Sequence, residues 1–209
     1  MCATSLNGCQ LLDRSLGDAG GGMLIAVGLW NFISAPVPLV IMIATVLFAV
    51  PGSRKLATWQ RCSPVAAVLL ILMVGVVAAL TLTPNPPAPG VTEILPPHYL
   101  ALLAHPRAVW AQLTAPPADG EQQANIALFV PIGVLAALVF GTIPRATLFG
   151  AALTVFVETC QYGIAGRAGS FTDIRNNTLG ALLGAIAVLM VVRSIRAQKS
   201  ANPGPGVGR

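Results

Sequence analysis

The chain has 209 residues, of which 55% are hydrophobic and only 9% are charged. A soluble globular domain carries about 25% charged residues, so this composition excludes a soluble domain and indicates an integral membrane protein. The composition also excludes disorder over most of the chain. The net charge is +5, but the basic residues are scattered and form no patch that would indicate a nucleic-acid partner.

Four or five stretches are apolar and long enough to be predicted as transmembrane helices, which need about 20 residues. In chain order they are residues 23–50, 64–83, 124–140, 146–164 and 178–192. The first contains Asn31, Pro36 and Pro38, so it is either one kinked span or an interfacial piece followed by a shorter span. The last would give only about 22 Å of helix at 1.5 Å per residue, which requires a thinned bilayer or snorkelling ends. The predicted fold class is an all-α polytopic bundle of about five spans.

The remaining segments are polar or rich in proline and glycine. The predicted organisation is a polar tail (1–22), a first span with a basic cytoplasmic loop (23–63), a transmembrane domain (64–192) that includes a proline-rich extracytoplasmic loop (84–123), and a basic, Pro/Gly-rich disordered tail (193–209). Within the proline-rich loop, residues 99–113 are apolar and predict a short interfacial helix that Pro106 and Arg107 interrupt.

No metal or cofactor site is expected. His98 and His105 are seven residues apart, a spacing that matches no recognised metal site. The cysteines form no CxxC pair, which favours unlinked thiols. They are Cys2, Cys9, Cys62 and Cys160.

Lysine and arginine residues are distributed unequally between the two sides of the predicted bundle. One side holds Arg54, Lys55, Arg61, Arg145, Arg193, Arg196, Lys199 and Arg209. The other side holds Arg14, Arg107, Arg167 and Arg175. The positive-inside rule makes the first side cytoplasmic, with the N-terminus outside and the C-terminus inside. If residues 23–50 do not cross the membrane, the N-terminus lies inside and the rest of the topology is unchanged.

Polar residues collect at one end of the last three predicted spans. Short connections place the start of the third span, the end of the fourth and the start of the fifth on the same face of the membrane. They are Asn125, Glu158, Gln161, Arg167, Asp173, Arg175 and Asn177. The distribution of bases makes this face extracytoplasmic. A lone carboxylate within a span costs several kcal/mol, so Glu158 is expected to face the bundle interior and to have partners. The cluster predicts a polar pocket open to the outer leaflet; the alternative is that these side chains only hold the helices together.

Two further motifs indicate close helix packing. Gly180 and Gly184 form a GxxxG motif, whose small residues let helix backbones approach. Phe129, Pro131 and Gly133 predict a kink and a packing site in the third span, where the proline frees a backbone carbonyl.

The residues identify no catalytic nucleophile. There is no GxSxG, HExxH or phosphate-binding glycine loop, and Ser170 has no histidine or lysine beside it. A binding protein is therefore favoured over an enzyme. A membrane enzyme that uses Glu158 or Asp173 as a general acid/base on a lipid-linked substrate stays open as an alternative.

The combined pattern resembles the VanZ-like family over residues 64–192. The resemblance rests on Asn125-x3-Phe129-x-Pro131-x-Gly133, on Glu158-x2-Gln161, on Arg167-x5-Asp173-x3-Asn177-x2-Gly180-x3-Gly184 and, more weakly, on Leu80-Thr-Leu-Thr-Pro84. Two positions depart from the family's pattern: Ser170 stands where an acid is frequent, and Arg175 where an apolar residue is usual.

The resemblance implies a multi-pass protein of the bacterial cell envelope. The family's founding member is an accessory determinant of teicoplanin resistance, and no enzymatic reaction is established for the family. We therefore expect membrane lipids as surroundings, and a lipid-linked cell-wall precursor or a lipoglycopeptide as the ligand. Arg167 and Arg175 would meet its phosphate or carboxylate groups. A scaffold that recruits another envelope protein through the GxxxG helix is a further alternative, for which the sequence names no partner.

Overall fold

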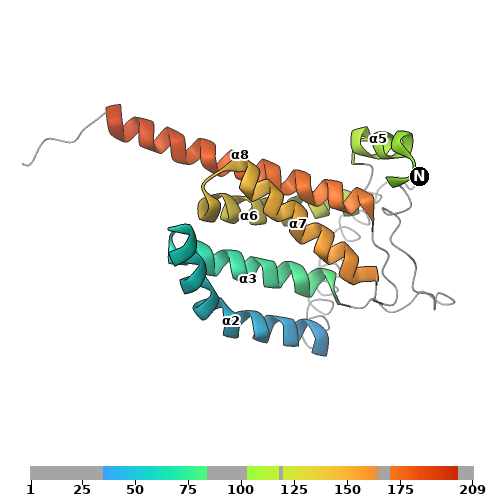
Figure 1. The fold of residues 1–209 in the computed structure, drawn as a ribbon, viewed down its shortest axis with the longest axis horizontal. Coiled ribbons are helices and arrows are strands. Elements are labelled where there is room, and N and C mark those ends of the chain that lie inside the picture. Colours follow the sequence, from blue (N-terminus) through green and yellow to red (C-terminus); the bar gives the residue numbers. More distant parts are fainter. Residues whose placement is uncertain (1–34, 84–102, 118–119, 163, 165–169, 202–209) are drawn as a thin grey trace, which may run out of the picture.

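The computed structural model describes residues 35–83, 103–117, 120–162, 164 and 170–201 (Figure 1). In these ranges all regular structure is helical, and there is no strand. The helices are α2 (Pro36–Gln60), α3 (Pro64–Thr81), α5 (Pro106–Thr114), α6 (Gly120–Phe140), α7 (Ile143–Tyr162) and α8 (Phe171–Ala201). All but α5 are long and apolar enough to cross a membrane. The all-α bundle with five candidate spans, predicted from the sequence, is confirmed.

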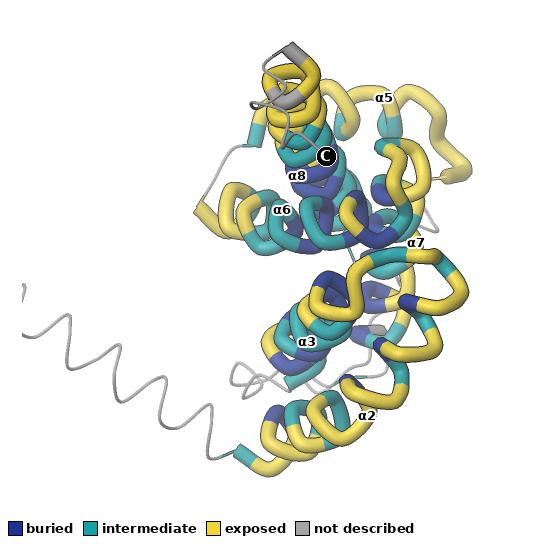
Figure 2. Tube along the Cα trace, turned by 90° about the vertical axis from the view of Figure 1, so that its left-hand side faces the viewer, coloured by how far each residue is buried: buried dark blue, intermediate teal, exposed yellow. Residues whose placement is uncertain are grey.

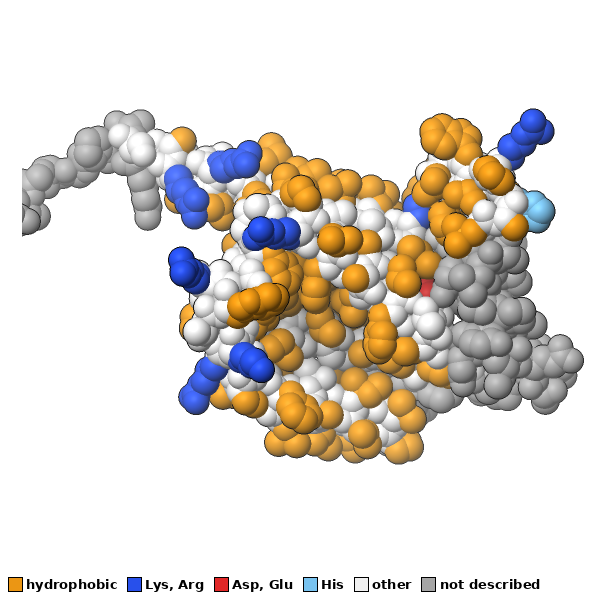
Figure 3. Space-filling view, viewed as in Figure 1, with side chains coloured by type: hydrophobic (Ala, Val, Ile, Leu, Met, Phe, Trp, Pro, Cys, Tyr) orange, Lys and Arg blue, Asp and Glu red, His pale blue; other side chains and the backbone are white. Residues whose placement is uncertain are grey.

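Large apolar side chains cover the outside of the long helices. Leu47 and Phe48 on α2, Leu148 on α7 and Met190 on α8 are each more than 60% exposed. Apolar side chains spread over the visible face of the bundle in Figure 3. A contiguous apolar surface of this kind is unfavourable in water but is covered by acyl chains in a bilayer. The chain is a multi-pass membrane protein.

The core lies between α3, α6, α7 and α8. Val77, Phe129 and Ile132 form one buried cluster, and a second is built largely from alanines such as Ala136 and Ala137. Small residues allow the close helix approach that stabilises membrane bundles. Figure 2 shows the buried positions concentrated in these helices, whereas α2 packs mainly against α3 and is largely exposed.

Glycines make the seam between α6 and α8 the tightest contact in the bundle. A Cβ atom added to Gly133 would overlap the carbonyl of Ala181. Added to Gly180 or Gly184, it would overlap a carbonyl of α6, that of Ile126 or Val130 respectively. The GxxxG face of α8 is therefore filled by α6 of the same chain.

The first span differs from its prediction. Residues 23–34 lie outside the described residues, and α2 continues through Pro51 to Gln60, so most of the loop predicted over 51–63 is helical. The prediction ended the span where the charged residues begin, but charged side chains can extend away from a helix that continues. Pro51 bends α2 rather than ending it, and Figure 1 shows the change of direction.

The last helix is about twice as long as predicted. It was predicted over 178–192, whereas α8 spans 31 residues, or about 46 Å at 1.5 Å per residue. It begins earlier because Ser170 and Asp173 form a helix N-terminus, and it continues through residues 193–201, which were predicted to be disordered. Residues 202–209 of that predicted tail lie outside the described part. The C-terminal turns project beyond the other helices (Figure 1).

The proline-rich loop contains the short helix predicted there, shifted along the chain. The structure describes it as α5, which begins at Pro106, a residue expected to interrupt it. Proline is favoured in the first turn of a helix, where its missing N–H has no intrahelical partner to lose. Trp110 and Leu113 are exposed, as in a helix that lies in the membrane interface.

One end of the bundle is rich in bases; we call it the basic end. The end of α2, the α6–α7 turn and the C-terminal turns of α8 meet there, and Figure 3 shows most of the Lys and Arg side chains on that side. Its described bases are Arg54, Lys55, Arg61, Arg145, Arg193 and Arg196. The α6–α7 turn is tight because Gly141 adopts a φ of 74°, the left-handed conformation that glycine favours after a helix.

Candidate functional site

A row of polar side chains lies along the buried face of α7. Thr154, Glu158 and Gln161 follow one another at intervals of four and three residues, which places them on one side of the helix. All three are buried, and Glu158 is only 2% exposed. This row points at the end of the bundle opposite the basic end; we call this region, with the residues of α6 and α8 that meet it, the polar end.

Glu158 accepts a hydrogen bond from the residue just before α8. Its Oε2 accepts a hydrogen bond of 2.8 Å from the N–H of Ser170, which directly precedes the helix. A carboxylate at a helix N-terminus is stabilised by the unpaired N–H groups and by the helix dipole. In a capping box a glutamate of the same helix does this; here it comes from α7. The prediction that Glu158 faces the interior and has partners agrees with this geometry.

Asn125 and Asp173 link the starts of α6 and α8. Asn125 Nδ2 donates to Asp173 Oδ1 at 2.8 Å, and both side chains are half-buried. Asp173 also lies in the first turn of α8, where a negative charge is favourable. The pair therefore sits nearer the surface than Glu158.

Gln161 brings a fourth helix to the polar end. Its Nε2 donates to the carbonyl of Thr81 at 2.9 Å. Thr81 is the last residue of α3, where backbone carbonyls lack intrahelical donors. Gln161 therefore joins the end of α7 to the end of α3, a contact that the three-helix prediction did not include.

Two asparagines at the start of α8 are buried side by side. Asn177 Nδ2 donates to Thr154 Oγ1 at 2.9 Å. Asn176, which is fully buried, accepts two hydrogen bonds from Arg175 at its Oδ1. Asn176 Nδ2 and Asn177 Oδ1 have no hydrogen-bond partner. An unpaired buried polar atom costs about 1–3 kcal/mol, so the polar end holds one donor and one acceptor that a bound group could satisfy.

Arg175 attaches α5 to the polar end. Its guanidinium donates to the carbonyls of Gln112 and Ala115 as well as to Asn176. These carbonyls belong to the C-terminal end of α5, where a cation is favourable. The hydroxyl of Thr172 donates a hydrogen bond of 3.2 Å to Gln112 Oε1. The two contacts place α5 over the start of α8.

The structure brings together six of the seven residues predicted for the site. They are Asn125, Glu158, Gln161, Asp173, Arg175 and Asn177. Arg167 lies outside the described residues. The predicted set lacked Asn176, Thr154 and Gln112. Thr154 is detectable from its spacing to Glu158, whereas no sequence signal connects Gln112 on α5 to Arg175.

The chemical groups at the polar end suit recognition of a polar ligand. Carboxylates, amides and hydroxyls are all present, and each carboxylate accepts a hydrogen bond from a neighbouring N–H group. Within the described part of the chain, no group of three or more His, Cys, Asp and Glu residues is placed to hold a metal ion.

The contact between Thr154 and Asn177 gives a first prediction. Thr154→Val preserves the shape of the side chain but removes the hydroxyl, leaving Asn177 Nδ2 unpaired. We expect the free energy of unfolding to fall by about 1 kcal/mol, measured by detergent-induced unfolding of the purified protein. Thr58→Val is the control, because Thr58 is exposed and bonds only to a carbonyl of its own helix. Equal losses of unfolding free energy in both variants would contradict the hydrogen bond between Asn177 and Thr154.

The contact between Arg175 and α5 gives a second prediction. In Arg175→Lys, the ammonium group cannot reproduce the planar fork that reaches several carbonyls. We expect backbone amides of α5 to exchange hydrogen about tenfold faster, while exchange in α3 and α6 stays unchanged. Arg107→Lys, an exposed substitution on α5 itself, should leave exchange unaltered. Unchanged exchange in Arg175→Lys would show that this residue does not hold α5.

Comparison with known proteins identifies the family of the chain. A family model described as VanZ/LLP1 matches residues 38–193, well over half of the chain. The chain belongs to the VanZ/LLP1 family. The family match includes almost all of α2, earlier than the start at residue 64 from which the sequence resemblance was traced. The match ends at residue 193, so the basic C-terminal turns of α8 and the residues after them lie outside it. Searches among curated proteins and among solved structures found no match.

Proposed function

We propose that this VanZ/LLP1-family protein lies in the bacterial cell membrane and binds an anionic lipid-linked cell-wall precursor or a lipoglycopeptide at its polar end, contributing to glycopeptide resistance. The observation that carries the proposal is the collection of buried polar side chains from α7 and α8 at one end of the bundle, where half-buried Asn125 of α6 and a backbone carbonyl of α3 meet them. Polar groups of this kind are costly within a membrane and usually mark a ligand or ion site.

The basic end supports an orientation for the proposal. Cytoplasmic ends of membrane proteins are enriched in Lys and Arg, so the basic end faces the cytoplasm and the polar end faces outward. This places the polar end at the outer leaflet, where lipid-linked precursors are exposed and glycopeptides act. The C-terminus is then inside.

The hydrogen bonds at the polar end suggest different roles for Arg175 and Arg167. Arg175 makes four hydrogen bonds to protein oxygens, and a guanidinium has only five donors. In the proposal Arg175 therefore positions α5 over the site, and Arg167 supplies the charge that meets the ligand's phosphate or carboxylate. Asn176 and Asn177 offer their unpaired donor and acceptor to the ligand.

Expression in a glycopeptide-susceptible bacterium tests the proposal. The wild-type protein should raise the inhibitory concentration of teicoplanin and change the amount of labelled teicoplanin bound at the cell surface. Arg167→Gln should lose both effects at equal membrane accumulation. Arg107→Gln, which removes a charge from the exposed side of α5, should keep them. If the wild-type protein changes neither quantity, the resistance role is wrong.

A further inference from the structure

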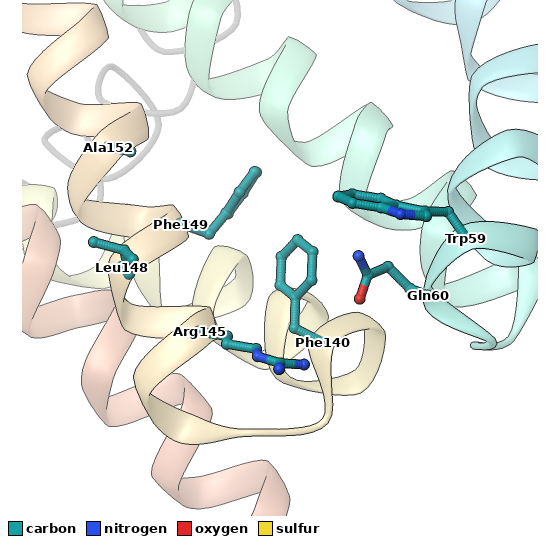
Figure 4. Close-up of a pocket in the computed structure, with 7 residues that line it drawn as sticks. All are labelled: Trp59, Gln60, Phe140, Arg145, Leu148, Phe149 and Ala152. Atoms are coloured by element: carbon teal, nitrogen blue, oxygen red, sulfur yellow. The ribbon is translucent and has the colours of Figure 1, made fainter.

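A hollow lies at the basic end, away from the polar end. It has a volume of about 490 Å³, within the range of about 300–1,000 Å³ typical of small-molecule sites. Figure 4 shows the residues that line it: Trp59 and Gln60 at the end of α2, Phe140 at the end of α6, and Arg145, Leu148, Phe149 and Ala152 on α7.

The walls of this hollow are aromatic. Phe140 and Phe149 pack against each other with ring centroids 5.4 Å apart and form its floor. Trp59 stands on the opposite side and is 77% exposed. Tryptophan is enriched where membrane meets water, since its ring is apolar and its indole N–H is a donor. An exposed tryptophan beside apolar walls is typical of the depth of lipid headgroups.

The charge at the hollow is positive. Arg145, in the first turn of α7, and the amide of Gln60 supply N–H donors on one side of it. The acids of the described residues are Glu121, Glu158 and Asp173, and all three lie at the other end of the helices. A neighbouring hollow of about 430 Å³ shares Trp59 and adds Lys55. An anion at this end is thus attracted by several bases and is not repelled by any of those acids.

An apolar stripe leads from the hollow towards the middle of the membrane. Leu148, Ala152 and Phe156 are exposed on one face of α7 below Arg145. From Arg145 to Phe156 the helix rises about 16 Å. Half the hydrocarbon thickness of a bilayer is about 15 Å. From Arg145 to the end of the stripe, the helix therefore spans about one leaflet, the depth that a single acyl chain occupies.

We propose that this hollow binds one anionic phospholipid. Arg145 and Gln60 hold its phosphate, the glycerol region lies against Trp59, and one acyl chain follows the Leu148–Ala152–Phe156 stripe. A guanidinium suits this role because its fork matches phosphate oxygens and carries a permanent charge. Basic pockets between helices near the membrane surface recognise lipid headgroups in this way. The inference is independent of the ligand proposed for the polar end.

Quenching of Trp59 by brominated lipid tests the site. The full chain carrying Trp30→Phe and Trp110→Phe, so that Trp59 is its remaining tryptophan, is reconstituted in phosphatidylcholine vesicles. Brominated phosphatidylglycerol or brominated phosphatidylcholine is added at equal mole fractions. We expect Trp59 to prefer phosphatidylglycerol about fivefold, equivalent to about 1 kcal/mol. Arg145→Gln in this background should remove the preference.

Two controls distinguish lipid binding at this hollow from general attraction of anionic lipid to the basic end. Arg196→Gln removes a base from the same end without touching the hollow and should keep the preference. A second reporter, with Trp110 kept and Trp30 and Trp59 replaced by phenylalanine, should show no preference, because Trp110 lies on α5 at the opposite end. Equal quenching of Trp59 by both lipids would overturn the proposal, as would equal losses in Arg145→Gln and Arg196→Gln.

Discussion

Replacing Gly184 with alanine is expected to lower the free energy of unfolding by about 1–3 kcal/mol. The added methyl group would overlap backbone atoms of Val130 and Val134 on α6, which cannot move aside as a flexible side chain can. Gly180→Ala should have a similar effect, because its Cβ would meet the carbonyl of Ile126. Detergent-induced unfolding of the purified variants measures both changes.

The control for these glycine variants is Gly120→Ala. Gly120 begins α6, and a Cβ added there meets no atom within 4 Å. This variant should be as stable as the wild type. If Gly184→Ala were equally stable, the close α6–α8 seam would be wrong, and the GxxxG face would be available to another protein. As the structure stands, α6 occupies that face, which argues against the scaffold alternative.

Glu158→Ala is expected to lower the free energy of unfolding by about 2 kcal/mol, since a hydrogen bond to a charged group contributes about 1.5–3 kcal/mol. The N–H of Ser170 would lose its acceptor, and the first turn of α8 would fray. Glu158→Gln retains an oxygen acceptor and should lose less than half as much. Unfolding and hydrogen exchange at residues 171–174 measure the difference.

The same pair of variants separates a positioning role from a catalytic one. If Glu158 positions α8, Glu158→Gln keeps most of the stability and the teicoplanin phenotype, while Glu158→Ala loses both together. A general acid/base would behave differently, because glutamine cannot transfer the proton: Glu158→Gln would then fold and insert normally but lose all function. Glu121→Gln, in the first turn of α6, is the matched control and should change neither property.

The polar end was predictable because helical spacing and short connections determine it. Glu158 and Gln161 share a face at a spacing of three, and the short α6–α7 turn makes these helices antiparallel neighbours. Once the spans are assigned, Asn125, Asp173 and Asn177 must lie near them. The same reasoning places Thr154 there. The prediction omitted Thr154 because a threonine within an apolar stretch is a weak signal of a polar site.

Other features depend on contacts between distant segments. Arg175 binds carbonyls of α5 about sixty residues earlier in the chain, and no local pattern indicates such a pairing. The ends of α2 and α8 were misplaced for a different reason. Hydropathy reports where a helix leaves the apolar layer, whereas the helix itself continues as long as its residues favour it. Charged, helix-favouring residues such as Arg193 and Arg196 extended α8 beyond the prediction. In α2 the helix continues even through Pro51 and Gly52, which disfavour helix, so there packing against α3 outweighs local propensity.

The most direct test of a ligand site at the polar end is the identity of the lipid that purifies with the protein. Lipids extracted from the wild-type protein and from Arg167→Gln would be identified by mass spectrometry, with Arg107→Gln as the control. We predict that an anionic lipid-linked cell-wall precursor is enriched with the wild type and with Arg107→Gln, and is lost from Arg167→Gln. The same bulk phospholipids in equal proportions from all three proteins, with no such precursor, would contradict the proposed site.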